Sequence, residues 1–198
     1  MGTTFVTEVF SSVVQVLLFS LIPFIVWLII ARKKESFFNW IGFKGVGDDK
    51  KNVLKYAIGA FVICEVVGFT VNNIFMKEIN ISQYAGYGIK GLPSAIIYAY
   101  IHTALSEEII FRGFIQKRLQ SKLGFRTAAI IQGLLFGLIH VVIGLGQINL
   151  VQGLVLMFYP MVPAILIAYV NEKKANGSII PGCLIHGTLN ILVQLSQL

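Results

Sequence analysis

Six long stretches of apolar residues dominate this 198-residue chain and limit what it can fold into. They lie at about Phe10–Ala31, Val53–Met76, Leu92–Gln116, Thr127–Leu145, Ile148–Val170 and Gly177–Val193. Each approaches the roughly 20 residues with which a helix crosses a hydrocarbon core of about 30 Å. Only helices and closed barrels satisfy their backbone groups in lipid, and stretches of this length favour helices. We therefore predict an all-α, multi-pass membrane protein, a bundle of about six transmembrane helices that forms a single integral membrane domain over residues 1–198.

The composition excludes most classes of soluble protein. Charged residues make up 13% of the chain and the residues AVILMFWYC make up 56%, with a mean hydropathy of +0.79. A soluble domain of this size has no room to bury that much apolar surface, so we expect the lipid bilayer to cover part of it. The same figures exclude disordered, collagen-like and disulfide-rich chains.

The basic residues are distributed unevenly among the loops. Of the sixteen Lys and Arg residues, thirteen lie in the three loops that follow the first, third and fifth stretches. These are Arg32, Lys33, Lys34, Lys44, Lys50, Lys51, Lys55, Lys117, Arg118, Lys122, Arg126, Lys173 and Lys174. Only Lys77 and Lys90 lie in the opposite loops. Cytoplasmic loops carry the excess of Lys and Arg, so both termini are predicted outside the cell and the basic loops in the cytosol. The positive charge then reflects topology, and no nucleic-acid partner is expected.

Several ionisable or strongly polar residues lie inside the apolar stretches, where an unpaired charge costs several kcal/mol unless it faces a wet cavity. They are Glu65, His102, Glu107, Glu108, Arg112, His140, His186 and Asn190. All three histidines of the chain are among them. This clustering predicts a polar cavity inside the bundle.

The third stretch contains the sequence Glu107-Glu108-Ile-Ile-Phe-Arg112. Glu108 and Arg112 are four residues apart and share a helix face, where a carboxylate and a guanidinium pair well. Glu107 points about 100° away from that face and is left for other interactions. The pattern alone also fits an ion pair that only joins two helices.

Two further stretches carry polar pairs at the same spacing. Phe136 and His140 share one face of the fourth stretch, and His186 and Asn190 share one face of the sixth. At 1.5 Å per residue, Glu107 and His186 lie about 15 Å from the basic loops and His140 about 21 Å. These similar depths predict that the three helices contribute to one site.

A carboxylate, an imidazole and a His/Asn pair suit hydrolysis by an activated water. A glutamate can act as general base with His140 positioning the water, while His186 and Asn190 donate hydrogen bonds to the oxyanion. The set Glu107, His140 and His186 also fits a zinc site with an open position for water. The His-Glu-x-x-His helix of common zinc proteases is absent from the sequence.

The three motifs Glu107-Glu108-x-x-x-Arg112-Gly113, Phe136-x-x-x-His140 and His186-x-x-x-Asn190 together resemble those of the CPBP family of intramembrane endopeptidases. This family contains the CAAX prenyl endopeptidases and the bacteriocin-processing and immunity proteins. The resemblance covers a motif-bearing core at about residues 92–198, and the first two stretches carry no matching motif.

The resemblance implies a helical bundle with a hydrophilic cavity in which a peptide bond is hydrolysed. By position, Glu107 resembles the water-activating glutamate and His140 its partner. His186 and Asn190 resemble the oxyanion hole, and Glu108 and Arg112 the residues that support the site. The resemblance favours a metal-free glutamate mechanism, without a cofactor, over the zinc-dependent alternative.

Six spans are fewer than the eight of eukaryotic CAAX enzymes, which favours a peptide or a membrane-associated protein over a prenylated substrate. A compact member of this kind is expected in a prokaryotic plasma membrane, in peptide processing or bacteriocin immunity. A non-catalytic immunity protein that binds its target in the membrane, or a small transporter, are the alternatives. Glu65 and His102 lie outside the motifs, and we expect them in packing or interhelical hydrogen bonds.

Overall fold

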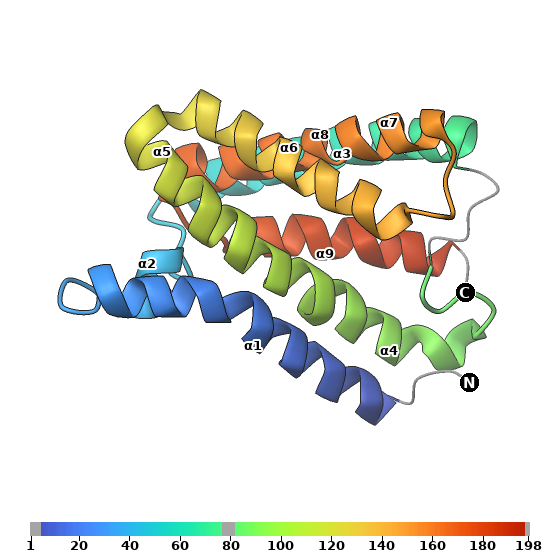
Figure 1. Cartoon of the computed structure of the whole chain (residues 1–198), viewed down its shortest axis with the longest axis horizontal. Coiled ribbons are helices and arrows are strands. Elements are labelled where there is room, and N and C mark those ends of the chain that lie inside the picture. The colour runs from blue at the N-terminus through green and yellow to red at the C-terminus, as the bar shows by residue number, and fades with distance from the viewer. Residues whose placement is uncertain (1–4, 77–81, 197–198) are drawn as a thin grey trace.

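The computed structural model describes residues 5–76 and 82–196, and helices form nearly all of that part of the chain, with no strand in it (Figure 1). The prediction of an all-α bundle is confirmed. Lys77 and the last two residues of the predicted motif-bearing core lie outside the described residues.

The first part of the chain contributes α1 (Phe5–Ile30), the short α2 (Phe37–Ile41) and α3 (Lys50–Phe75). Helix α1 begins five residues before the predicted span and therefore includes Glu8. Helix α2 begins at Ser36, whose side chain accepts a hydrogen bond from the Asn39 amide, and ends at Gly42 with a φ of 85°. Buried Trp40 and Ile41 attach α2 to the bundle.

The predicted third span is a continuous helical path that changes from α- to π-helical geometry. It comprises η1 (Gly88–Gly91), α4 (Leu92–Ile97), η2 (Tyr98–Leu105), η3 (Glu108–Gln116) and α5 (Lys117–Leu123). The two π-helical segments η2 and η3 flank Ser106 and Glu107. Stretches of π-helix are rare and occur often at functional sites, so this region is a candidate site on backbone geometry alone.

The last part of the chain contains α6, α7, α8, η4 and α9. Their bounds are Phe125–Gly144, Leu150–Phe158, Met161–Tyr169, Val170–Lys174 and Ile180–Leu195. The predicted fifth span is interrupted between α7 and α8 at Pro160, because proline lacks the amide hydrogen that a continuous helix needs. Pro181 lies in the first turn of α9, where that missing hydrogen has no cost.

Four helical stretches among the described residues are long and apolar enough to cross a membrane: Phe5–Ile30, Lys50–Phe75, Phe125–Gly144 and Leu150–Lys174. The path through α4, η2 and η3 and the 16-residue α9 correspond to the remaining predicted spans. Helix α9 packs against η2, α3, α8 and η4, and Figure 1 shows it behind the long path that contains α4. Helix α9 therefore contacts helices from the first, middle and last parts of the chain.

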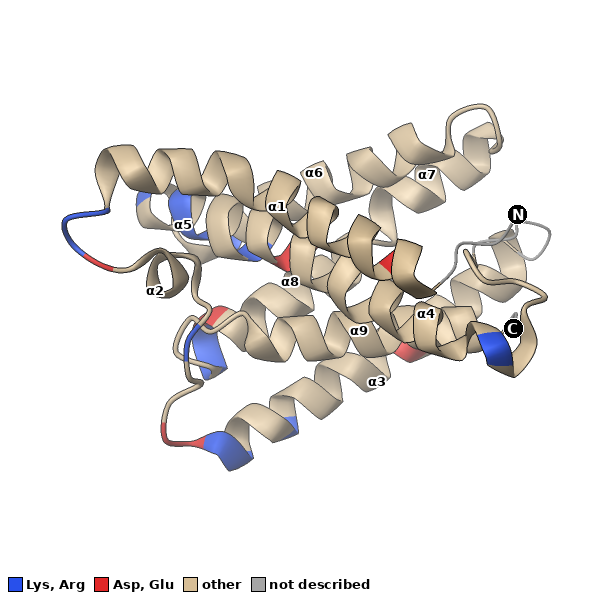
Figure 2. Cartoon of the chain, turned by 90° about the horizontal axis from the view of Figure 1, so that it is seen from below, with Lys and Arg blue, Asp and Glu red and all other residues tan. Residues whose placement is uncertain are grey.

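Figure 2 shows most of the Lys and Arg residues at one end of the bundle, near α2, α5 and the start of α3. Lys90, just before α4, lies near the other end, by the termini. This is the separation of charge on which the predicted topology depends. Which end faces the cytosol stays a prediction.

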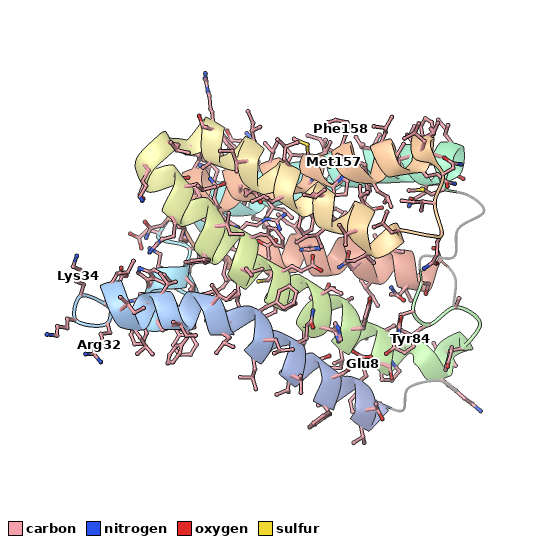
Figure 3. All side chains as sticks on the ribbon, viewed as in Figure 1. Glu8, Arg32, Lys34, Tyr84, Met157 and Phe158 are labelled. Atoms are coloured by element: carbon pink, nitrogen blue, oxygen red, sulfur yellow. The ribbon has the colours of Figure 1, made fainter. Side chains whose placement is uncertain are left out.

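Close packing of α6 on α7 depends on Gly137. A Cβ added there would collide with the backbone carbonyl of Met157, a residue of α7 that is labelled in Figure 3. Gly133, one turn earlier, faces Met161 and Ala164 of α8, the next helix along the chain. The Gly-x-x-x-Gly pattern therefore lets these helices approach closely, and α6 is held in the position from which His140 reaches the site.

Candidate active site

Glu108 is the most deeply buried acid of the predicted site, with no exposed surface. Its Oε1 lies 3.3 Å from Nη1 of Arg112, one turn further along the helix, and Arg112 is itself 1% exposed. The pairing predicted from their spacing is present. A buried carboxylate costs much less free energy when a guanidinium lies beside it, so Arg112 offsets part of the cost of burying Glu108.

The imidazole of His186 lies between the two adjacent glutamates. Its Nδ1 is 3.3 Å from Oε1 of Glu108, and its Nε2 is 3.6 Å from Oε2 of Glu107. The shorter contact fits a hydrogen bond that Nδ1 donates to the Glu108 carboxylate. The longer one is an ion-pair distance, beyond the range of a direct hydrogen bond.

Glu107 differs from Glu108 in its access to the surroundings. The Glu107 side chain is 22% exposed, whereas that of Glu108 is completely enclosed. Within the described residues, the only ion pair of Glu107 is the one with His186. Of the two carboxylates, Glu107 is therefore the one that a substrate and a water can reach.

Asn171 is a site residue that the sequence analysis did not identify. It is completely buried in η4, and its Nδ2 donates to Oε2 of Glu108 at 3.4 Å, while its Oδ1 accepts from the Gly182 amide at 3.0 Å. A Cβ at Gly182 would lie only 2.5 Å from Oε2 of Glu108 and 2.6 Å from Nδ2 of Asn171. The absence of a side chain at Gly182 thus allows the start of α9 to lie directly against Glu108.

The buried ring of Phe136 lies between His140 and the cluster around Glu108. The His140 ring packs edge-on against it with centroids 4.6 Å apart, and the His186 ring does so at 5.9 Å. The guanidinium of Arg112 lies 4.6 Å from the centre of the same ring, a favourable cation–π distance. Phe136 therefore holds three polar side chains around one aromatic surface.

His140 has a defined hydrogen-bonding state. Its Nδ1 lies 2.8 Å from the carbonyl oxygen of Phe136, and a carbonyl can only accept, so Nδ1 carries the hydrogen. In the neutral ring this leaves the lone pair on Nε2 as an acceptor. Among the residues that the structure describes, His140 forms no ion pair with either glutamate, so its contribution requires a bridging water.

Asn190 follows His186 by one turn on α9, as its spacing predicts. Its Nδ2 donates to Oγ1 of Thr103 at 2.7 Å. The structure thus brings Glu107, Glu108, Arg112 and His186 into direct contact, while His140 and Asn190 reach the same region through neighbours.

Residues 90–192 match the family model described as type II CAAX prenyl endopeptidase Rce1-like. The match covers just over half of the chain and includes every residue of the predicted site. The chain belongs to this family. The predicted resemblance to CAAX-type intramembrane endopeptidases is thereby confirmed, and family and apolar helices together indicate an integral membrane protease. Comparisons with curated proteins and with solved structures give no match.

In this Rce1-like chain, the alternative zinc set of Glu107, His140 and His186 would have to bind the metal through Nε2 of both histidines. Nδ1 of His140 is bonded to a backbone carbonyl, and Nδ1 of His186 faces Glu108. In residues 5–76 and 82–196, no three His, Cys, Asp or Glu side chains are grouped closely enough to hold one metal ion. We therefore derive no catalytic step through zinc.

At the basic end of the Rce1-like core, Lys117 joins two segments of the chain. Its Nζ lies 2.5 Å from Oε1 of Glu172 and 2.7 Å from the carbonyl oxygen of Gly177, in the turn before α9. Burial lowers the pKa of Lys117, and the neighbouring Glu172 carboxylate opposes that shift. The contacts fix the end of η3 to the segment that contains Asn171, and so help to hold the support of Glu108.

The two ionisable residues outside the motifs have different environments. Nδ1 of His102 lies 3.2 Å from Oε1 of Glu8 on α1, so the expected interhelical contact is present. Glu65 is half-buried on α3 and, within the described part of the chain, has no ion pair or side-chain hydrogen bond, so the interhelical bond expected for it is not observed.

Proposed function

We propose that this protein hydrolyses peptide bonds within the membrane and that Glu107 is the general base for the attacking water. The observation that carries the proposal is the position of His186 between two carboxylates, of which only Glu107 is accessible. A single buried ion pair would serve packing. The second carboxylate, Glu107, is accessible and lies beside an imidazole, which is the environment that a general base needs.

In the first step, a carboxylate oxygen of Glu107 removes a proton from water, and the water oxygen attacks the carbonyl carbon of the scissile bond. A positioned general base typically accelerates such a step by about 10²–10⁴-fold. The Nε2 lone pair of His140 accepts a hydrogen bond from the same water, because its Nδ1 hydrogen is committed to the Phe136 carbonyl. His140 thereby orients the water without itself taking the proton.

As the new bond forms, the π electrons of the carbonyl move to its oxygen. His186 and Asn190 donate hydrogen bonds to this oxyanion. Since Nδ1 of His186 faces Glu108, the hydrogen on Nε2 is the one available to the oxyanion. The scheme thus requires a hydrogen on each ring nitrogen of His186 at this step, with Nδ1 donating to Glu108 and Nε2 to the oxyanion.

In the second step, the oxyanion collapses, the carbon–nitrogen bond breaks and the leaving amine takes the proton from Glu107. The products are a new carboxyl terminus and a new amino terminus, and Glu107 returns to its carboxylate form. Glu108 and Arg112 touch neither water nor substrate in this scheme. They hold His186 in position throughout.

The substrate that we propose is a peptide or a membrane-associated protein, in peptide processing or bacteriocin immunity. The site lies among membrane-spanning helices, so a substrate that partitions into lipid reaches it without leaving the bilayer. A prenyl group on the substrate is a separate question, which a matched pair of lipidated and unlipidated peptides resolves.

The test is cleavage of fluorogenic peptides by purified protein in liposomes, with the variants Glu107→Ala and His140→Ala in parallel. We expect cleavage by the wild-type protein, and losses of about 10²–10⁴-fold for Glu107→Ala. Cleavage by Glu107→Ala at the wild-type rate would contradict the proposal. Elemental analysis with a chelator-treated assay completes the test, since stoichiometric zinc lost together with activity would replace the glutamate mechanism by the metal-dependent one.

A further inference from the structure

The π-helical segment η2, which precedes Glu107, is attached to neighbouring helices through three polar side chains within four residues. The hydroxyl of Tyr100 lies 2.9 Å from that of Thr188 on α9. His102 faces Glu8 on α1, and Thr103 accepts the hydrogen bond from Asn190 on α9. Of these residues, Thr103 is the one whose partner belongs to the proposed oxyanion hole.

The hydroxyl of Thr103 donates its hydrogen to backbone carbonyls of its own helix. Its Oγ1 lies 2.9 Å from the carbonyl oxygen of Ala99 and 3.2 Å from that of Tyr98, and neither carbonyl can donate. Threonine in a helix commonly donates in this way, because its branched Cβ limits χ1 to rotamers that face the preceding turn. The oxygen of the hydroxyl is therefore available to Asn190 only as an acceptor.

Because the Thr103 hydroxyl donates within its helix, it determines which end of the Asn190 amide faces it. An acceptor attracts the NH₂ group and not the carbonyl oxygen of the amide, and the NH₂ nitrogen lies at 2.7 Å. If the amide were flipped, Thr103 would have to give up the bond to its own helix. The second hydrogen of Nδ2 has no acceptor among the described residues, so it remains available to a ligand.

We propose that Thr103 is a positioning residue for the oxyanion hole, which selects the amide orientation of Asn190 and leaves its second N–H for the carbonyl oxygen of the substrate. Thr103 does not touch the reacting atoms. Its effect on the rate passes entirely through Asn190. This inference rests on the proposed peptide hydrolysis and adds a residue that lies outside the three motifs.

The experiment is a double-mutant cycle on peptide cleavage in liposomes, with Thr103→Val, Asn190→Ala and the double variant. Valine keeps the branched shape and removes the hydroxyl. We expect Asn190→Ala to lower kcat by about 10²–10³-fold, as for the loss of one oxyanion donor. Thr103→Val should lower kcat by about 10-fold with KM within about twofold, and should add less than about twofold in the Asn190→Ala background.

Thr103→Ser is the matched control, because it restores the hydroxyl without the methyl group, and it should keep kcat within about threefold of wild type. If thermal unfolding shows that the valine variant does not fold, Thr103→Ala replaces it in the same cycle. Equal losses from Thr103→Val in both backgrounds, or failure of the serine variant to restore kcat, would overturn the inference. Unchanged activity of Glu107→Ala would contradict the proposed general base but not the Thr103 inference. The coupling between Thr103 and Asn190 is measured independently by the double-mutant cycle.

Discussion

Two buried glutamate–histidine pairs lie in this bundle, and their differences indicate why we propose only one of them as a catalytic site. Glu108 with His186 belongs to the three motifs, and Glu8 with His102 lies between α1 and η2. Both carboxylates are almost completely enclosed. Burial of a Glu/His pair therefore does not by itself indicate chemistry.

The cluster around Glu8 is occupied by hydroxyl donors. Oε1 accepts from Ser12 at 3.0 Å and lies beside His102, and Oε2 accepts from the hydroxyl of Tyr84. Figure 3 labels Glu8 and Tyr84, which point toward one another at the end of the molecule where α1 begins. With both oxygens engaged, Glu8 serves as a clamp that joins α1, the segment before α4, and η2.

The cluster around Glu108 differs in having a second, accessible carboxylate. Glu108 receives contacts from Arg112, His186 and Asn171, but next to it Glu107 offers a second carboxylate with an exposed surface. The cluster thus pairs one enclosed, fully supported acid with one accessible acid. We attribute the proposed chemistry to this asymmetry, which the Glu8 cluster lacks.

The two histidines of the clusters are expected to differ most in the effect of substitution by alanine, and His186→Ala is the variant with the large loss. It removes an oxyanion donor, so kcat for peptide cleavage should fall by about 10²–10³-fold. The matched variant His102→Ala in the outer cluster should stay within about threefold of wild type, because His102 contacts no proposed catalytic residue. A similar loss for both variants in the liposome assay would remove the distinction between the clusters.

Next in size is the effect of Glu8→Ala on stability. The substitution leaves the hydroxyls of Ser12 and Tyr84 without their acceptor, and the free energy of unfolding should fall by about 1–3 kcal/mol. Reversible denaturation in mixed micelles measures this change, and kcat per folded molecule should be unaffected. Unchanged stability would show that the clamp contributes nothing to the fold.

A smaller effect, on catalysis, is expected for Asn171→Ala. Glu108 loses a hydrogen bond while Arg112 and His186 still hold it, so kcat should fall by about tenfold, or about 1.4 kcal/mol of transition-state stabilisation. Asn176 is an exposed residue in the turn before α9 with a φ of 54°, which glycine also adopts, so Asn176→Gly is a control that should not change kcat. Full activity of Asn171→Ala would remove Asn171 from the site.

The smallest expected effect is that of Tyr84→Phe. It removes one hydrogen bond to Glu8 and keeps the buried ring, so the free energy of unfolding should fall by about 1 kcal/mol. A loss larger than that of Glu8→Ala would show that the Tyr84 hydroxyl stabilises the fold through more than its bond to Glu8.

The sequence predicts those features that follow from bulk hydropathy or from spacing within one helix. The positions of the long helices and the Glu108–Arg112 pair belong to this class, because each depends on neighbours within a few residues along the chain. The separation of basic residues to one end of the bundle is predicted for the same reason.

Features that depend on how helices meet are not predictable in this way. Glu8 precedes the apolar stretch and was not recognised as part of a span, yet α1 begins early enough to bury it. Asn171 stands beside the basic loop and looks like a polar end of a span, whereas the turn into α9 encloses it completely. The contact of Asn190 with Thr103 also needs the packing of α9 on η2, which no local pattern encodes.

The account is tested most directly by replacing the accessible and the enclosed acid with their isosteric amides, Glu107→Gln and Glu8→Gln, and measuring cleavage of one peptide per folded molecule. A carboxamide keeps the shape and loses the base, so Glu107→Gln should reduce the rate by about 10²–10⁴-fold while Glu8→Gln stays within about threefold. Equal rates for Glu107→Gln and wild type, or equal losses for both variants, would contradict the assignment of Glu107 as the base.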